Sequence, residues 1–263
     1  MKIIERPCKT ALSRSGIYGW VYALNPYRGC EHACRYCYAP NILRLKRATW
    51  GTFLEVKKNV PVVLAKELKR LTPGLVGISS VTDPYQKIEE KYELTRYCLE
   101  QLLKYKFPIS IITKSPKVLR DIELLKKFSY SEITITITTL DSQLSNLLEP
   151  NAHSISERLK ALTKLSAEGL NTYAFLGPLL PSLEPEQVPE FIDKIKATGV
   201  KTIMVDTLNL KPGIWQDVES AIKKIPKTRD KFYSRLFEES GYYPEIFNLI
   251  ETECIRQGVN FEF

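Results

Sequence analysis

Strand-like and helix-like segments alternate from about residue 20 to residue 206, and this order constrains the fold more than any other feature. Apolar runs typical of strands lie at 20–24, 75–81, 108–113, 133–139, 171–180 and 200–206. Apolar residues recur at helical spacing in 61–71, 88–105, 117–128, 154–168 and 185–197. Repeated βα units favour a parallel sheet, and this number of units is typical of a partial, open (β/α)6 barrel in the α/β class.

The length of 263 residues suits one large α/β domain or two small ones. We expect a TIM-barrel-like core over 1–206, with a lead-in over about 1–19. The remainder, 207–263, is expected to be a helical C-terminal extension packed on the core, with a break at Gly241. No apolar run approaches the roughly eighteen residues of a membrane span, and the first residues lack an apolar signal core. These features predict a cytoplasmic protein without a membrane partner.

Three cysteines in eight residues, Cys30, Cys34 and Cys37, have the spacing C-x3-C-x2-C. Three thiolates can hold three corners of an iron–sulfur cube, so that a small molecule can bind the fourth iron. The alternatives are a structural zinc site or a structural cluster. Zinc usually takes closed pairs of ligands; no second pair exists here, and His32 is an awkward fourth ligand. Cys98 falls on a helical stripe and is expected to pack in the core.

The positive charge is concentrated near these cysteines. Residues 1–60 hold eleven Lys or Arg and three Glu, and 11 − 3 gives the whole net charge of +8. Residues 61–263 hold twenty-seven charges of each sign. A basic zone beside a reactive site suits an anionic substrate such as nucleic acid. The alternative is that the cations only compensate the negative charge of a thiolate-bound cluster and its ligand.

Several motifs around the strand ends form a series. They are Asn-Pro-Tyr-Arg-Gly-Cys at 25–30, Ser-Ser-Val-Thr-Asp-Pro-Tyr-Gln at 79–86, Thr-Lys-Ser at 113–115, Thr-Ile-Thr-Thr-Leu-Asp at 136–141, and Glu-Pro at 149–150 followed by Arg158. The series resembles the spore photoproduct lyase-like branch of the radical S-adenosylmethionine (SAM) superfamily, often labelled DNA repair photolyase-related. The similarity extends from about residue 10 to residue 206.

The resemblance implies a [4Fe-4S] cluster on Cys30, Cys34 and Cys37. In this superfamily the open iron binds the amino and carboxylate groups of SAM. One electron then cleaves SAM to a 5′-deoxyadenosyl radical that abstracts hydrogen from a substrate. An external flavodoxin- or ferredoxin-like donor would supply the electron. The implied activity is that of a lyase- or transferase-type enzyme whose substrate the sequence does not give.

The resemblance also implies contacts to SAM at the strand ends. Tyr36 would meet the adenine with its ring and backbone, although packing alone also explains a buried aromatic. Leu176 and Gly177 would lie against the adenine, since glycine permits close approach. Ser79 and Ser80 would accept hydrogen bonds from the SAM amino group.

The carboxylate and ribose of SAM have their own implied partners. Lys114 would pair with the carboxylate, unless it is a solvated surface lysine. Arg158 would lie near the same carboxylate, with Glu149 orienting it. Thr136 and Thr138 are two residues apart and face one side of their strand, where the family binds the ribose. Plain β-propensity equally explains the two threonines.

One position departs from the family pattern. True spore photoproduct lyases carry a hydrogen-donating cysteine where this chain has Ser80, aligned on Thr82 and Asp83. A hydroxyl hydrogen is far harder to abstract than a thiol hydrogen, which argues against thymine-dimer repair by that route. Asp83 could accept from the SAM amino group or only cap the turn that follows it.

The sequence thus predicts a radical SAM enzyme with one cluster that is not a true spore photoproduct lyase. The first candidate for its substrate is a nucleic acid base. The alternatives are a protein side chain or small metabolite as substrate, or a non-catalytic metal-binding protein.

Overall fold

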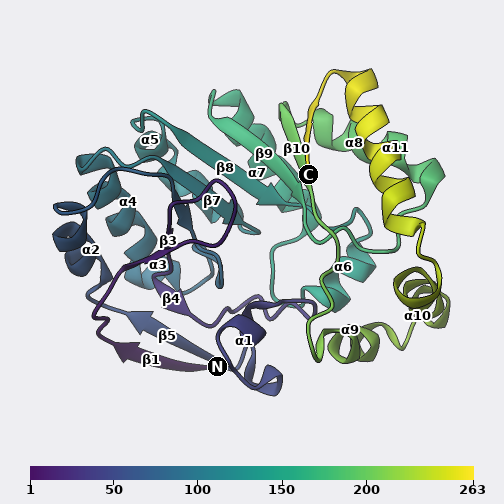
Figure 1. Cartoon of the computed structure of the whole chain (residues 1–263), viewed down its shortest axis with the longest axis horizontal. Coiled ribbons are helices and arrows are strands. Elements are labelled where there is room, and N and C mark those ends of the chain that lie inside the picture. The colour runs from purple at the N-terminus through teal and green to yellow at the C-terminus, as the bar shows by residue number, and fades with distance from the viewer.

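The computed structural model describes all residues, 1–263, and its main sheet has eight strands in the order β11-β10-β9-β8-β7-β6-β3-β2 (Figure 1). The six central strands run parallel and follow the predicted order along the chain. They are β3 (Tyr22–Leu24), β6 (Val76–Ile78), β7 (Ile109–Thr113), β8 (Ser131–Thr136), β9 (Asn171–Leu176) and β10 (Thr202–Val205). The expected partial (β/α)6 barrel is confirmed.

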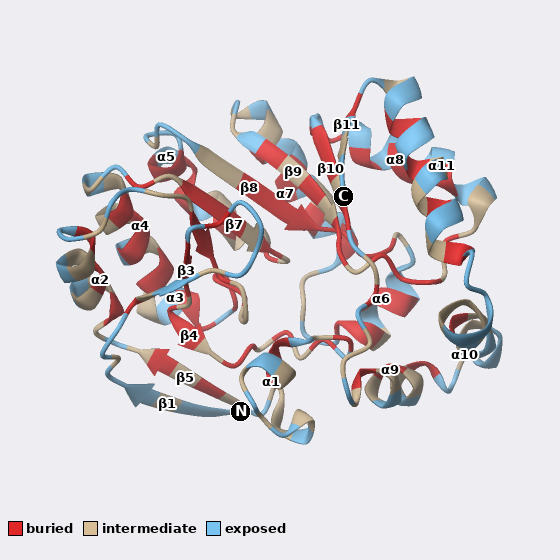
Figure 2. Ribbon diagram, viewed as in Figure 1, coloured by how far each residue is buried: buried red, intermediate tan, exposed pale blue.

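Helices cover one face of this sheet and bury their apolar sides against it (Figure 2). In α4, Leu94, Cys98 and Leu102 are buried because they recur every three or four residues along one side. Cys98 is wholly buried in the main hydrophobic core, as predicted. The covering helices are α2 (Val60–Leu68), α4 (Leu94–Lys104), α5 (Ile122–Leu125), α7 (Ile155–Ala167) and α8 (Val188–Lys196).

Two predicted helices are interrupted. The segment 88–105 divides into α3 (Glu89–Tyr92) and α4, because Glu93 adopts a left-handed conformation with φ of 48°. The buried carboxylate of Glu89 accepts the Thr95 N–H at 3.1 Å and so draws the start of α4 toward it. The segment 117–128 begins as a 3-10 helix over Pro116–Asp121 and becomes α-helical only in α5. The expectation of one continuous helix was wrong in both segments.

A separate three-stranded sheet lies beneath the cysteine loop and was not predicted. Its order is β1-β5-β4, from β1 (Lys2–Arg6), β5 (Phe53–Lys57) and β4 (Tyr27–Arg28). Leu54 and Val56 point into the core, while Glu55 points outward and pairs with Arg28 at 3.2 Å. Since β4 ends two residues before Cys30, this sheet fixes the start of the cysteine loop.

The segment after β10 is mainly helical, as expected. It contains α9 (Ile214–Ile222), α10 (Pro226–Tyr233), a π-helical turn (Ser234–Glu238) and α11 (Tyr242–Gln257), which begins directly after Gly241. The segment then returns to the sheet as β11 (Asn260–Glu262), which pairs in parallel with β10 and was not predicted. At the other edge β2 (Leu12–Arg14) pairs antiparallel with β3. None of the helices is both long and apolar enough to cross a bilayer.

Candidate functional site

The predicted site residues gather at one edge of the main sheet (Figure 1). Ser79 directly follows β6, Lys114 directly follows β7, and Gly177 directly follows β9. Thr136 is the last residue of β8, and the cysteine loop begins just after β4. Because parallel strands end at the same edge, loops that are far apart in the sequence meet there.

The three cysteines of the loop are free thiols, with Cys30 and Cys34 buried and Cys37 half-buried. Burial raises the pKa of Cys34 to about 12, against the opposing charge of Lys114. Thiols bind metal as thiolates, so metal binding here would displace protons. No three His, Cys, Asp or Glu side chains are arranged to hold a single metal ion.

Arg47 holds the cysteine loop in place, and sequence reasoning missed it. Its guanidinium donates to the backbone carbonyls of Cys37 and Arg35, each at 2.9 Å, and to Oδ1 of Asn41 at 2.9 Å. Its Nε donates to Asp217 in α9 at 2.7 Å. A planar guanidinium can make all four contacts at once, and the compact ammonium of a lysine cannot. No sequence motif marks Arg47, because its partners lie on distant parts of the chain.

A buried carboxylate, Glu149, lies at the centre of the site and binds the Arg158 guanidinium in an ion pair with both side chains fully buried. Glu149 also accepts hydrogen bonds from the Tyr36 hydroxyl, from Thr138 at 3.0 Å and from Ser145 at 3.3 Å. Burial favours its neutral form, but the charges of Arg158 and Lys114 and these hydrogen bonds lower the pKa of Glu149. Glu149 is therefore an ionised acceptor that joins the cysteine loop to the barrel.

Arg158 is held on all sides by protein atoms. Besides Glu149, it donates to the carbonyl of His153 at 2.8 Å and to the carbonyl of Thr136 at 3.3 Å. The predicted orienting contact from Glu149 is present. The direct contact of Arg158 with a SAM carboxylate stays a prediction.

Among the cations of the site, Lys114 is the one whose ammonium group has no bonded partner. Its Nζ lies 5.6 Å from the centre of the Tyr36 ring and makes no ion pair or hydrogen bond. Its backbone N–H donates to the buried Asp83 carboxylate at 2.9 Å. This geometry leaves the ammonium of Lys114 open to an anionic ligand beside the cysteine loop.

Asp83 acts as a structural acceptor. Its Oδ1 accepts from the Thr113 hydroxyl and from the backbone N–H of Tyr85, both at 2.8 Å. Its Oδ2 lies 3.5 Å from Nδ1 of His32, whose pKa is lowered by burial. Of the two roles considered for Asp83, capping the turn is the one that the structure displays.

The two serines after β6 differ in their surroundings. The hydroxyl of Ser79 is buried and has no hydrogen-bond partner. The hydroxyl of Ser80 accepts from the Asn25 side chain at 3.2 Å, and the Ser80 carbonyl accepts from the Tyr38 hydroxyl at 2.7 Å. Buried polar groups are almost always paired, so the free Ser79 hydroxyl indicates a position where a ligand donor fits.

The end of β9 is closely packed. A Cβ atom on Gly177 would lie 1.9 Å from the Phe175 ring, so this ring requires glycine at the position. The side chain of Leu176 is wholly buried in the main core, and its carbonyl accepts the Asp206 N–H at 3.2 Å. Contact of Leu176 and Gly177 with adenine stays a prediction.

Comparison with known families identifies the class of protein that this barrel and cysteine loop define. Residues 24–195 match the family model described as the Radical SAM superfamily. The match covers more than half of the chain and contains the cysteine loop, the strand ends and the Glu149–Arg158 pair. The chain therefore belongs to the radical SAM superfamily.

Individual relatives support this assignment. An uncharacterized protein of Methanocaldococcus jannaschii is 37% identical over 185 residues, which cover 70% of each chain. An uncharacterized protein of Mycobacterium tuberculosis is 31% identical over 218 residues, covering 78% of this chain and 64% of that one. The chain thus spans about two thirds of the length of these relatives. The Radical SAM Nalpha-GlyT isomerase of Pseudomonas phage M6 is 24% identical over 220 residues, covering 82% of this chain and 45% of the isomerase.

Solved structures of spore photoproduct lyase share the fold. A mutant of that enzyme with bound AdoMet and dinucleoside spore photoproduct aligns with a TM-score of 0.72 at 14% identity. The alignment covers 99% of this chain and 82% of the lyase. The predicted resemblance to the spore photoproduct lyase-like branch is confirmed at the level of the fold.

Proposed function

We propose that this protein is a radical SAM enzyme that generates a 5′-deoxyadenosyl radical and abstracts hydrogen from a nucleic acid base. The carrying observation is that three free thiols, the open Lys114 ammonium and the unpaired Ser79 hydroxyl gather at one edge of the sheet. Cys30, Cys34 and Cys37 would hold the [4Fe-4S] cluster. When bound, the cluster supplies the electron that cleaves SAM.

The residues of the chain fit the charged groups of SAM. The Ser79 hydroxyl can accept a hydrogen bond from the SAM ammonium, and the Lys114 ammonium can pair with the SAM carboxylate. The Tyr36 hydroxyl donates a hydrogen bond to Glu149, and this contact fixes the orientation of the Tyr36 ring beside Lys114. The chain's main contribution is thus to orient SAM and to exclude water from it.

One comparison supports a nucleic acid base as substrate. A mutant of spore photoproduct lyase, which shares the fold, was solved with a bound dinucleoside spore photoproduct. The net charge of +8 also favours an anionic polymer. The three clustered cysteines provide ligands for one cluster alone. We therefore propose that an external flavodoxin- or ferredoxin-like donor supplies the electron for SAM cleavage.

The reaction is proposed to differ from that of spore photoproduct lyase. Position 80 is a serine whose hydroxyl already accepts a hydrogen bond from Asn25. The thiols outside the loop are Cys8, Cys98 and Cys254, and the latter two are wholly buried among helices. A thiol that returns hydrogen to a repaired thymine dimer is therefore not part of the proposed mechanism.

An anaerobic assay tests the proposal. The reconstituted protein should hold about four iron and four sulfide per chain, and after reduction it should convert SAM to 5′-deoxyadenosine. Oligonucleotides deuterated in their bases should transfer deuterium to that product. Transfer from peptides or small metabolites instead would reject the substrate class. One zinc per chain with no iron would reject the enzyme itself.

A further inference from the structure

The structure points to a second functional surface, on the C-terminal helices beside the cysteine loop. We infer that it binds the backbone of a single-stranded nucleic acid, which extends the proposed function by locating its polymeric substrate. We call it the basic track. Its six cations are Arg44, Lys46, Lys211, Lys223, Lys224 and Lys227.

The segment 211–237 is more positive than the net charge of the surrounding sequence indicates. Residues 61–263 are neutral as a whole, yet residues 211–237 hold seven Lys or Arg and three Asp or Glu, which is 7 − 3 = +4. Two of these seven cations, Lys231 and Arg235, pair with Glu184 outside this range. All three acids are paired: Asp217 with Arg47 at 2.7 Å, Glu219 with Arg229 at 2.5 Å, and Asp230 with Arg229 at 3.1 Å. The four lysines of the track in this region form no ion pair, so their charges remain available to a ligand.

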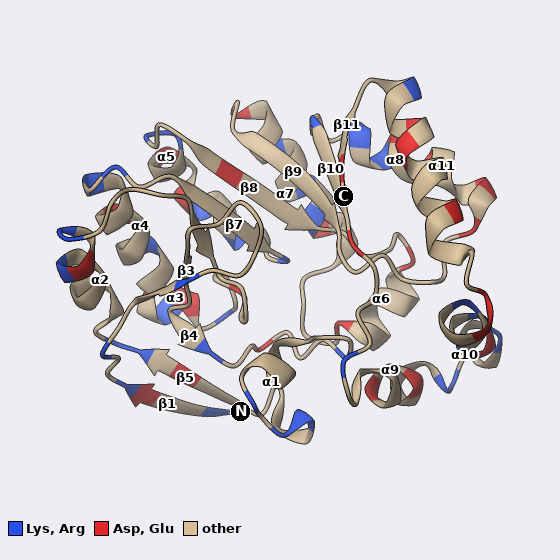
Figure 3. Cartoon of the chain, in the orientation of Figure 1, with Lys and Arg blue, Asp and Glu red and all other residues tan.

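The segment that carries Arg44 and Lys46 is in contact with the segment that carries Lys211. Asn41, next to the segment with Arg44 and Lys46, donates to the carbonyl of Pro212 at 2.9 Å. Lys211 therefore lies beside the cysteine loop, and α9 leads from there to the lysines at its far end. Figure 3 shows basic residues, coloured blue on the ribbon, near both ends of α9. Since a helix rises about 1.5 Å per residue, the nine residues of α9 extend about 14 Å.

Aromatic rings lie at the start of α9, where Trp215 follows Lys211 by four residues. Trp215, Tyr233 and Phe237 form a cluster with ring centres 5.1 to 6.0 Å apart. Phe237 is 50% exposed and Tyr233 is 39% exposed, although both lie on a strongly charged segment. Exposed rings beside unpaired cations are typical of single-strand binding, where bases stack on the rings while cations follow the phosphates. This pairing favours a single strand over a duplex or an acidic protein.

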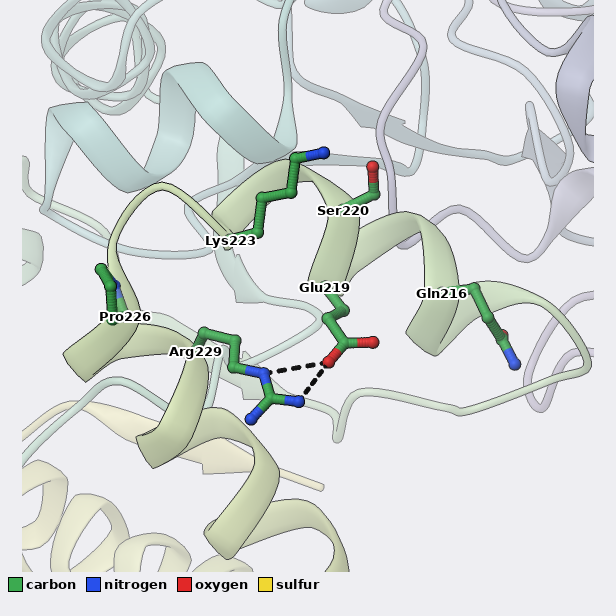
Figure 4. A pocket seen from close by; sticks show the side chains of 6 residues that line it. All are labelled: Gln216, Glu219, Ser220, Lys223, Pro226 and Arg229. Atoms are coloured by element: carbon green, nitrogen blue, oxygen red, sulfur yellow. Dashed lines mark hydrogen bonds and ion pairs between the residues drawn. The ribbon is translucent and has the colours of Figure 1, made fainter.

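A hollow between α9 and α10 lies on the same surface (Figure 4). Its volume is about 360 Å³, and Lys223 and Arg229 reach it from the two helices. Glu219 in the hollow is neutralised by Arg229, while Lys223 has no partner. The hollow thus has one free positive charge and room for a phosphate group. The other residues that line it are Gln216, Ser220 and Pro226.

The contact between Arg47 and Asp217 sets the track against the active site. The same guanidinium binds the carbonyl of Cys37, so α9 and the cysteine loop share one side chain. A strand lying on the track would pass directly beside the loop that is proposed to hold the cluster. A base turned out of that strand would then face the cysteine loop.

Salt-dependent binding of a fluorescent single-stranded DNA to the reconstituted protein tests this inference. The triple variant Lys223→Gln/Lys224→Gln/Lys227→Gln should reduce the slope of log K against log salt by about 2, since each phosphate contact contributes about 0.7. At 0.1 M salt the affinity should fall on the order of 100-fold. Phe237→Leu should weaken binding about five-fold or more without changing the slope, because it removes stacking alone.

The matched control is Lys69→Gln/Lys104→Gln/Lys127→Gln. These exposed lysines lie at or just after the C-terminal ends of α2, α4 and α5, and they also form no ion pair. Equal losses in both triple variants would overturn the track and leave only a general charge effect. Binding that prefers duplex DNA or an acidic protein would overturn the single-strand assignment. Formation of 5′-deoxyadenosine from SAM alone is measured in parallel, so failure of the proposed chemistry is distinguishable from failure of the track.

Discussion

The ion pair between Glu149 and Arg158 gives a quantitative test of the site. Glu149→Gln keeps the size of the side chain but removes its charge, which leaves the Arg158 guanidinium fully buried without a counter-ion. Removing one partner of a buried pair typically costs about 3–5 kcal/mol of folding free energy. The hydrogen bonds from Tyr36 and Thr138 would also weaken, because a neutral amide oxygen is a poorer acceptor than a carboxylate.

The loss should be visible in thermal unfolding under anaerobic conditions. For a chain of 263 residues, each kcal/mol corresponds to about 2 °C, so the melting temperature should fall by roughly 6–10 °C. The control Thr138→Val removes one neutral donor to the same carboxylate and should cost about 1.5–3 kcal/mol, less than removal of the charge. The double variant Glu149→Gln/Arg158→Met removes both charges, so it should be less destabilised than the sum of its two single variants.

Two results would refute this reasoning. If Glu149→Gln melts within about 1 °C of the wild type, then the Arg158 guanidinium is not left as an uncompensated buried charge when Glu149 is neutralised. If the double variant shows simple additivity, then the two side chains do not interact in the folded protein.

Three further predictions concern other parts of the site and core. Ser79→Ala should leave the SAM-free protein equally or more stable while weakening SAM binding about ten-fold or more, as measured by melting and by equilibrium dialysis. Cys30→Ala should abolish iron and sulfide incorporation, whereas Cys8→Ser should retain both. Gly77→Ala should destabilise the fold by about 1–3 kcal/mol, since its Cβ would lie 1.7 Å from the Trp20 ring; an unchanged unfolding midpoint would contradict this packing.

The sequence predicts the parts of the fold whose signal is local. Each central strand is an apolar run that ends in polar residues, and each run appears in the sheet. The small sheet was not predicted, because its pairing joins Lys2 to Phe53, which are far apart in the chain and have no hairpin signal between them. The helix break at Glu93 was also not predicted. It depends on the buried carboxylate of Glu89, which is held by the distant Arg120 at 2.9 Å.

The candidate site divides in the same way. The cysteine spacing and the polar residues after each strand are visible in the sequence, because short motifs and strand ends are local. The contacts of Arg47 with α9 and of Tyr36 with Glu149 are not visible, since tertiary packing creates them. Asp83 illustrates an intermediate case: the sequence left two roles open, and its contacts with Thr113 and Tyr85 display one of them.

The pairing of β11 with β10 has a consequence for how the chain folds during synthesis. Residues 260–262 complete the sheet beside β10, although β10 itself ends 55 residues earlier at Val205. A nascent chain that has just finished the barrel therefore presents an unpaired parallel edge until those last strand residues leave the ribosome. Such an edge is a template for association with other chains. Shortened versions that stop before residue 260 are thus expected to aggregate even though every proposed cluster and SAM ligand is present.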